Sequence, residues 1–176
     1  MISKDILLKR IDNMRLLYLT GWCGSGLLRI PQGQDLISKL TMKIGDKEIK
    51  FDEVLHYLKD PKGRDSLLTE YGKIFLRTVT RDSFEIIREY CRKTNQIQIF
   101  ERQPWYIFAK IIRNAMAHDF RFGFTKNDRK QLPITWNGMT ITEEMEGSYL
   151  FVEVFTWGDA WNILQNYWQF VKNELN

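Results

Sequence analysis

PWYIFAKIIRNAMAHDF, residues 104 to 120, is the stretch of sequence that decides the fold. Its apolar side chains recur at helical spacing, so that Trp105, Phe108, Ile112 and Met116 share one face. Pro104 suits the first turn of a helix, where a missing backbone N–H costs nothing. The sequence therefore predicts a long amphipathic helix that begins near Pro104 and buries this face.

Helices are also predicted on both sides of this stretch. A first helix is expected to end at the glycine-rich residues 21–26, which lack the Lys-Ser/Thr ending of a phosphate-binding loop. A long helix is expected from Ser66 to about Lys93. The last helix is expected from about Trp157 to Leu175, with Thr156 as its N-cap. The buried face of the first helix is expected to carry Leu7, Ile11, Met14 and Tyr18.

Between the last two helices the apolar period changes to that of strands. Residues 134–141 read ITWNGMTI, and Asn137-Gly138 supplies the two positive φ angles of a type I′ turn. The two-residue loop places Trp136 opposite Met139 on the face expected to pack on the bundle, and Thr135 opposite Thr140 on the other. Residues 150–155 could form a third strand or extend the last helix backward.

These elements predict a mainly α fold: a single domain over residues 1–176, built as a helical bundle with a small β-hairpin inserted before the last helix. Residues 21–64 are expected to be a loop-rich elaboration with a short helix near Asp52 to Leu58. Its basic residues are expected to be solvated surface. They are Lys39, Lys43, Lys47 and Lys50.

Composition excludes several classes of protein. The chain of 176 residues is 44% hydrophobic, which suits a compact core, and its net charge of +4 tolerates a polyanionic partner without demanding one. No apolar run approaches the ~20 residues of a membrane span, and the N-terminus has no signal-peptide core. Cys23 and Cys91 have no metal-ligand spacing, and are expected to be inert buried thiols in a reducing cytoplasm.

The chemically richest segment is Arg113 to His118, which reads RNAMAH. Nowhere else in the chain do a strong cation, an amide and an imidazole occur within six residues; His56 has no such neighbours. Arg113 could hold an anion beside His118, which titrates near neutral pH, and together these groups are the minimum for cutting a phosphodiester. On an ideal helix the two positions lie roughly 140° apart, so they do not share a face by default. The long Arg113 side chain could swing round, residues 119–123 could let the helix loosen near His118, or a two-fold dimer could bring two Arg and two His together.

Arg113, Asn114 and His118 match, position by position, the Arg-polar-x3-His motif of ribonucleases in the HEPN superfamily (higher eukaryotes and prokaryotes nucleotide-binding), and the order of helices is similar too. The resemblance implies a helical-bundle homodimer in which the motif helices of both protomers face one cleft. Phe120 stands where family members silenced by a nucleotidyltransferase carry a modifiable Tyr, which weighs against that route of regulation.

The function implied by the resemblance is a metal-independent endoribonuclease, a toxin or phage-defence effector in the cytoplasm with a possible antitoxin. Arg113, Asn114 and His118 would be its catalytic residues, and RNA its substrate, because attack needs the 2′-hydroxyl. No cofactor or metal is expected. Five cations that flank the motif are candidates for contacts with the RNA backbone. They are Lys110, Arg121, Lys126, Arg129 and Lys130.

Two other interpretations stand beside this one. In the first, the domain is a non-catalytic dimeric module that binds RNA, a nucleotide or another protein; Arg113 then pairs with Glu85 or another helix-borne acid, and His118 merely ends a helix. In the second, the chain is a plain helical interaction protein whose aromatic last helix is the dock, with Trp161 and Trp168 at its centre.

Overall fold

The computed structural model describes residues 3–150 and 154–176, and it confirms a mainly helical fold with small antiparallel hairpins. Contacts divide the chain into two compact units. Unit 1 comprises residues 1–18 and 76–176, and unit 2 comprises residues 19–75. The sequence predicts a single domain over residues 1–176 and does not predict this division.

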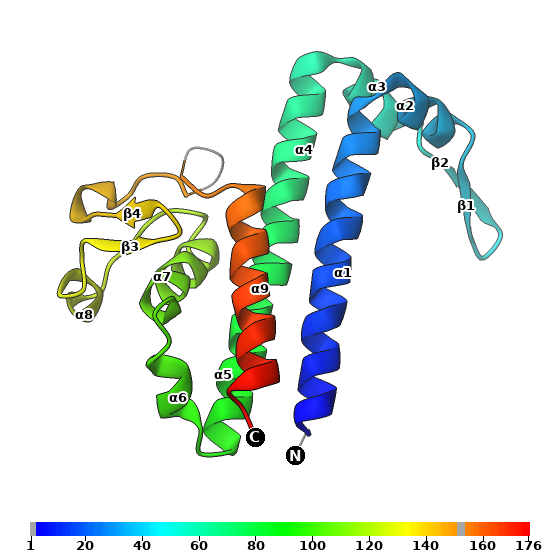
Figure 1. The fold of residues 1–176 in the computed structure, drawn as a ribbon. Helices are drawn as coiled ribbons and strands as arrows, with labels where there is room; N and C mark the ends of the chain where they lie inside the picture. Colours follow the sequence, from blue (N-terminus) through cyan, green and yellow to red (C-terminus); the bar gives the residue numbers. More distant parts are fainter. Residues whose placement is uncertain (1–2, 151–153) are drawn as a thin grey trace. The chain divides into compact units, whose positions relative to one another are not determined.

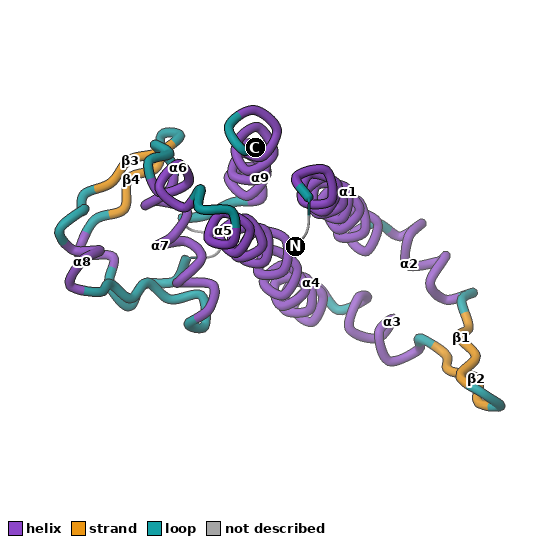
Figure 2. The backbone as a smooth tube through the Cα atoms, turned by 90° about the horizontal axis from the view of Figure 1, so that it is seen from below, coloured by secondary structure: helices purple, strands orange, loops and turns teal. Residues whose placement is uncertain are grey.

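Unit 1 is a helical bundle organised around α5 (Ser83–Lys93). α7 (Tyr106–Ala117), the helix predicted from the opening stretch, packs against α5 on one side, and α9 (Trp157–Asn173) packs against it on another. α6 (Ile97–Glu101) links α5 to α7 and was not predicted. Figure 2, which looks along α5, shows it lying between α7 and α9. The candidate residues on α7 are therefore held against the centre of the bundle.

The core of unit 1 is aromatic, which accounts for much of the unusual aromatic content of the chain. Phe84 of α5 lies 5.1 Å, centroid to centroid, from Phe100 and 5.7 Å from Tyr106. Phe100 in turn meets Phe170 at 5.4 Å. Tilted and stacked ring pairs of this kind add stability beyond the area they bury. The predicted apolar face of α7 is buried in this core. Its members are Trp105, Phe108, Ile112 and Met116.

The long helix expected from Ser66 to Lys93 is continuous but not uniform. α4 (Pro61–Leu76) gives way to a π-helical segment, η1 (Arg77–Asp82), before α5 begins. Its centre holds the β-branched residues 78–80, which fit a regular α-helix less well than unbranched ones. The Ser83 hydroxyl donates a hydrogen bond of 2.5 Å to the Val79 carbonyl, and thereby satisfies an acceptor within the widened turn.

The predicted hairpin is confirmed in register and in facing. β3 (Ile134–Trp136) pairs antiparallel with β4 (Met139–Ile141), and Asn137 and Gly138 have φ angles of 49° and 79°. The hydroxyls of Thr135 and Thr140 meet at 2.8 Å on the exposed face. On the other face the Trp136 ring lies 5.1 Å from Phe108 of α7, so the hairpin packs on the bundle as expected. Figure 1 shows it beside α7.

The sequence did not decide whether residues 150–155 form a third strand or extend the last helix backward. Residues 151–153 lie outside the described residues, but α9 begins at Trp157 with an extended Thr156 as its N-cap, so the helix does not extend backward through residues 154 and 155. The predicted N-cap is confirmed. The Thr156 hydroxyl accepts from the Asp159 N–H, and the Asp159 carboxylate accepts from the Thr156 N–H at 2.9 Å.

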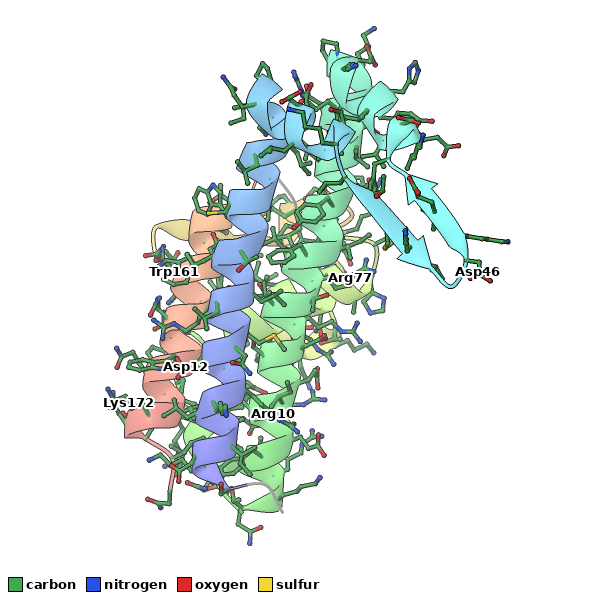
Figure 3. The ribbon with its side chains drawn as sticks, turned by 90° about the vertical axis from the view of Figure 1, so that its right-hand side faces the viewer. Arg10, Asp12, Asp46, Arg77, Trp161 and Lys172 are labelled. Atoms are coloured by element: carbon green, nitrogen blue, oxygen red, sulfur yellow. The ribbon has the colours of Figure 1, made fainter. Side chains whose placement is uncertain are left out.

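Unit 2 is not loop-rich, contrary to prediction. After the end of α1 it contains α2 (Pro31–Ser38), an antiparallel hairpin of β1 (Thr41–Ile44) and β2 (Lys47–Lys50), and α3 (Asp52–Lys59). The short helix near Asp52 is thus confirmed. The β1–β2 hairpin is exposed on both faces, with Asp46 in its turn (Figure 3). Its exposure confirms that the lysines of this region are solvated.

The expected loop at residues 21–26 was also wrong, because α1 (Lys4–Arg29) continues through it. Gly21 is buried in unit 2, and a Cβ there would lie 2.2 Å from the ring of Phe75. Glycine at this position therefore allows close packing and does not end the helix. Cys23 is exposed on this helix, which corrects its expected burial, whereas Cys91 is buried as expected and burial raises its pKa to about 12.

The length of α1, 26 residues, raises the question of a membrane span. Charged residues such as Lys9, Arg10 and Asp12 recur along it. Neither α1 nor any other helix of the described residues combines the length and the apolarity needed to cross a bilayer.

Replacing Gly33 tests the packing of unit 2. Gly33 is buried, and a Cβ there would lie 1.9 Å from the Leu27 carbonyl oxygen, which belongs to the backbone and cannot rotate away. We expect Gly33→Ala to lower the free energy of unfolding by about 1–3 kcal/mol. Gly26→Ala is the matched control, because no atom lies within 4 Å of its added Cβ and alanine favours a helix by up to ~1 kcal/mol. Urea denaturation followed by circular dichroism measures the stability of both variants. Equal stability would contradict this packing.

Candidate functional site

Arg113 projects from α7 toward α5 and is already engaged there. Its side chain is 23% exposed, and one end of the guanidinium forms an ion pair with Glu85 of α5. The other end donates a hydrogen bond of 2.8 Å to the Asn114 side-chain oxygen. Glu85 also forms an ion pair with Arg88, one turn along α5, at 2.7 Å. Arg113 and Asn114 are thus brought together, and the pairing of Arg113 with Glu85 considered from the sequence is confirmed.

His118 is the C-cap of α7, where the chain leaves helical geometry. Its backbone N–H donates to the Asn114 carbonyl at 3.1 Å and to the Ala115 carbonyl at 3.0 Å. His118 is exposed. The next two residues, Asp119 and Phe120, have positive φ angles of 58° and 56°. Helical geometry ends at His118, because α7 stops at Ala117 and the next residues leave the helical region. Among the described residues no polar contact joins the His118 ring to Arg113.

The loop that follows His118 is held in place by residues that precede α9. Phe120 is 2% exposed, and its carbonyl accepts from the Leu150 N–H at 2.8 Å. Phe122 accepts from the Gly147 N–H, also at 2.8 Å, and donates its own N–H to Ser148 at 3.0 Å. A bulky aromatic residue at positive φ is strained, so these contacts must hold it there. They fix the backbone next to the exposed imidazole.

Two arginines of η1, Arg77 and Arg81, lie on the helix that packs against α7, and neither was a candidate from the sequence. The guanidinium carbon of Arg77 (Figure 3) lies 5.0 Å from the centre of the Phe120 ring. Eight residues later, Glu85 forms its ion pair with Arg113. α7 therefore runs antiparallel to η1 and α5, which it contacts. Arg81 lies about one turn from Arg77 and one turn from Glu85, and so falls level with the last turn of α7. The spacing Arg77-Arg81-Glu85 in the sequence was the signal that could have revealed this row.

The last turn of α7 and the neighbouring η1 carry one exposed imidazole and several guanidinium groups. Within the described residues, no hydrogen bond joins the His118 ring to Arg113 or Asn114, so the motif is not preassembled as a hydrogen-bonded triad. An exposed imidazole can take or give a proton, and guanidinium forks suit phosphate oxygens. A single His118 can serve as base or as acid in one step, but not as both.

Three of the five cations expected to contact RNA are held by other groups of the chain. Lys110 pairs with Asp128 at 2.9 Å. Arg121 lies 4.0 Å from the Tyr149 ring centre and donates to the Gly147 carbonyl. Arg129 pairs with two glutamates after β4, at 2.5 Å. Their glutamate partners are Glu143 and Glu146, in and beside the 3-10 turn η2 (Glu143–Met145).

The other two expected cations, Lys126 and Lys130, are exposed in and after α8 (Lys126–Arg129). In the part of the chain that the structure describes, neither takes part in an ion pair. Only these two of the five are free to follow a nucleic-acid backbone without giving up a partner.

Asp128 anchors this region of the chain. Burial of its carboxyl, 2% exposed, opposes ionisation, but hydrogen bonds from Thr125 and Lys110 outweigh that cost and lower its pKa. Its carboxylate also accepts from the Thr125 N–H at 3.0 Å and so caps α8. Lys110 is therefore a structural residue of α7, and not a freely available cation.

The aromatic last helix, proposed from the sequence as a possible dock, is covered on one side by the chain itself. The guanidinium of Arg15 on α1 lies 5.6 Å from the Trp161 ring centre and 4.8 Å from that of Trp168. Lys172 lies 4.4 Å from the Trp168 ring, and Figure 3 shows Trp161 and Lys172 along α9. These indoles are half-buried within unit 1, which leaves less of them for a partner.

Comparisons of the chain with models of known protein families, with curated proteins and with solved structures found no match. Function must therefore be inferred from the side chains themselves. Among the described residues, no group of His, Cys, Asp and Glu side chains is arranged to hold a metal ion.

Replacing Asp128 tests whether Lys110 is structural. We expect Asp128→Asn to lower the free energy of unfolding by about 2 kcal/mol near neutral pH, because Lys110 loses its partner. A lowered folded-state pKa contributes stability above the unfolded-state value of ~3.9, and this contribution disappears as the pH falls through the folded-state value. The difference between the variant and the original protein should therefore shrink below about pH 4.

The control is Asp159→Asn at the start of α9. Asp159 makes the same capping box with Thr156 but has no lysine partner among the described residues. Its loss should cost about 1 kcal/mol. Equal losses in the two variants would show that the Lys110 pair contributes nothing.

Proposed function

We propose that the protein is a metal-independent endoribonuclease acting at the exposed edge formed by α7 and η1. One observation carries the proposal: His118 is exposed at the C-cap of α7, two residues before Phe120, whose ring lies 5.0 Å from the guanidinium carbon of the half-buried Arg77. An exposed imidazole near guanidinium groups is suited to phosphodiester transfer. The resemblance of Arg113, Asn114 and His118 to the HEPN ribonuclease motif supports the same chemistry.

In the proposed reaction, the His118 imidazole takes the proton of a ribose 2′-hydroxyl. The 2′-oxygen forms a bond to the adjacent phosphorus as the bond to the 5′-oxygen breaks, and a second proton donor protonates the departing 5′-oxygen. Arg113 stabilises the charge that builds on the phosphoryl oxygens. Asn114, hydrogen-bonded to Arg113, orients that guanidinium. The products are a 2′,3′-cyclic phosphate and a 5′-hydroxyl.

A second protomer is the proposed source of the proton donor. Each chain offers one His118, which can act as base or acid but not as both at once. A two-fold dimer that brings two copies of this edge together would supply both groups. The proposed setting is a cytoplasmic toxin or phage-defence effector, restrained by an antitoxin. The net charge of +4 fits an RNA substrate.

A second candidate function is a non-catalytic module that binds RNA, a nucleotide or a protein. The observation that favours it is the engagement of Arg113 by Glu85 and Asn114, which a structural residue would also show. His118 would then only end the helix. Both functions use the same surface, so they differ in what happens to bound RNA.

Cleavage of labelled single-stranded RNA in excess EDTA separates the two candidates. The original protein should cut, leave cyclic-phosphate ends, and lose at least about 100-fold in rate on His118→Ala, because general acid–base catalysis contributes that much. His56→Ala is the matched control, since His56 is an exposed histidine of α3 in unit 2, and it should cut at the original rate.

A folded protein that binds RNA but never cuts it would overturn the nuclease and favour the binding module. Equal loss in both histidine variants would remove His118 from the site.

A further inference from the structure

We propose that Arg77 and Arg81 of η1, together with Arg113, bind a phosphodiester group of the RNA backbone, and that Glu85 is the internal counter-ion from which this phosphate takes Arg113. This inference rests on the proposed function, because it names the contacts that bring RNA to His118. It adds two binding residues that lie outside the sequence motif, and it assigns a regulatory role to an acid that the motif does not include.

The geometry places these groups in one row. Arg77 reaches the Phe120 ring beyond the end of α7, and Glu85 reaches Arg113 within it. Arg81 lies between them on the same helix, about one turn from each, and η1 packs against α7. His118 lies at the same level, at the end of α7. A phosphate held by Arg81 and Arg113 would therefore lie beside the exposed imidazole.

The arginines in this row outnumber the carboxylates that pair with them. Arg77 and Arg81 are half-buried, and each has a buried Nε atom without a hydrogen-bond partner. No carboxylate pairs with either of them over residues 3–150 and 154–176. Glu85 neutralises only Arg113 and Arg88. A half-buried guanidinium without an anion is costly, so the binding of an anion here would recover energy that the free protein lacks.

The orientation of Arg77 suits a phosphate ligand. Its guanidinium carbon lies over the Phe120 ring, 5.0 Å from the ring centre. A guanidinium over an aromatic ring can still offer N–H groups at its edge, and these groups form the fork that matches phosphate oxygens. The buried Phe120, held at positive φ by the chain before α9, thereby positions Arg77 as well as the loop next to His118.

The two arginines lie in a π-helical segment of an otherwise α-helical run. π-helical turns are rare and occur frequently at functional sites. Arg77 and Arg81 both lie within η1. Thr80, in the same segment, is fully buried and its hydroxyl lacks a hydrogen-bond partner among the described residues. A distortion retained at this energetic cost is consistent with a role in binding.

Glu85 competes with a bound phosphate for the guanidinium of Arg113. In the free protein the Glu85 carboxylate forms ion pairs with both Arg88 and Arg113. When a phosphate binds Arg113, Glu85 keeps Arg88 and is not left as an unpaired half-buried charge. The exchange thus replaces one anion on Arg113 by another, and the cost of breaking the Glu85 pair lowers the affinity for RNA. Removing the charge of Glu85 should therefore strengthen binding.

The test measures the affinity for a fluorescein-labelled single-stranded oligoribonucleotide by anisotropy, with every variant in a His118→Ala background to prevent cutting. Arg77→Gln and Arg81→Gln should each weaken binding about tenfold, and each should reduce the slope of log affinity against log salt by about one. Glu85→Gln should strengthen binding several-fold. Arg102→Gln, at an exposed arginine after α6, removes the same charge elsewhere and should change affinity less than about twofold.

The outcomes distinguish failure of this inference from failure of the proposed function. If both η1 variants weaken binding no more than Arg102→Gln, the phosphate site is refuted, even if the original protein cuts RNA. If the variants behave as expected but the original protein never cuts, the phosphate site stands and the nuclease fails. Should Arg81→Gln not fold, Glu85→Gln still decides, because weaker binding in that variant contradicts the role of Glu85 as a competing anion.

Discussion

The ion pair between Arg113 and Glu85 is the constraint on which the candidate site depends. It joins α7 to α5, the helix at the centre of unit 1, and it does so within a layer of buried rings that leaves little freedom for either helix. Glu85 is shared with Arg88, so the pair is part of a half-exposed network. Such networks contribute modestly to stability. Their larger effect here is to fix the direction in which a guanidinium points.

The same interaction serves both a structural and a chemical interpretation, because a carboxylate and a phosphate compete for the same guanidinium. A ligand that supplies phosphate oxygens can replace Glu85 on Arg113, provided that Glu85 retains Arg88. The positive φ angles of Asp119 and Phe120 fix the chain just beyond His118. Rigid backbone around an exposed imidazole is what a site for proton transfer requires, since misplacement by about 1 Å can cost 100-fold in rate.

α7, α9 and the β3–β4 hairpin were predictable because their signals are local. Asn137-Gly138 fixes a turn by itself, and the apolar stripe of α7 needs only helical periodicity. Other features depend on contacts that a sequence does not display. Gly21 continues a helix because Phe75 packs against it, η1 arises within a run that reads as an ordinary helix, and Lys110 is occupied by a buried acid eighteen residues away. For the candidate site, the sequence suggests Arg113, Asn114 and His118, but it does not suggest Arg77 and Arg81, since their proximity to α7 depends on the antiparallel packing of that helix.

Nuclear magnetic resonance of the arginine Nε–H groups tests the central claim most directly. The protein would be titrated with a single-stranded oligoribonucleotide whose 2′-hydroxyls are methylated, so that it binds but cannot be cut. We predict that the signals of Arg77, Arg81 and Arg113 shift together with the ring signals of His118, along one saturation curve. A titration in which these signals stay fixed while those of Lys126 and Lys130 move would contradict the account and place RNA elsewhere on the protein.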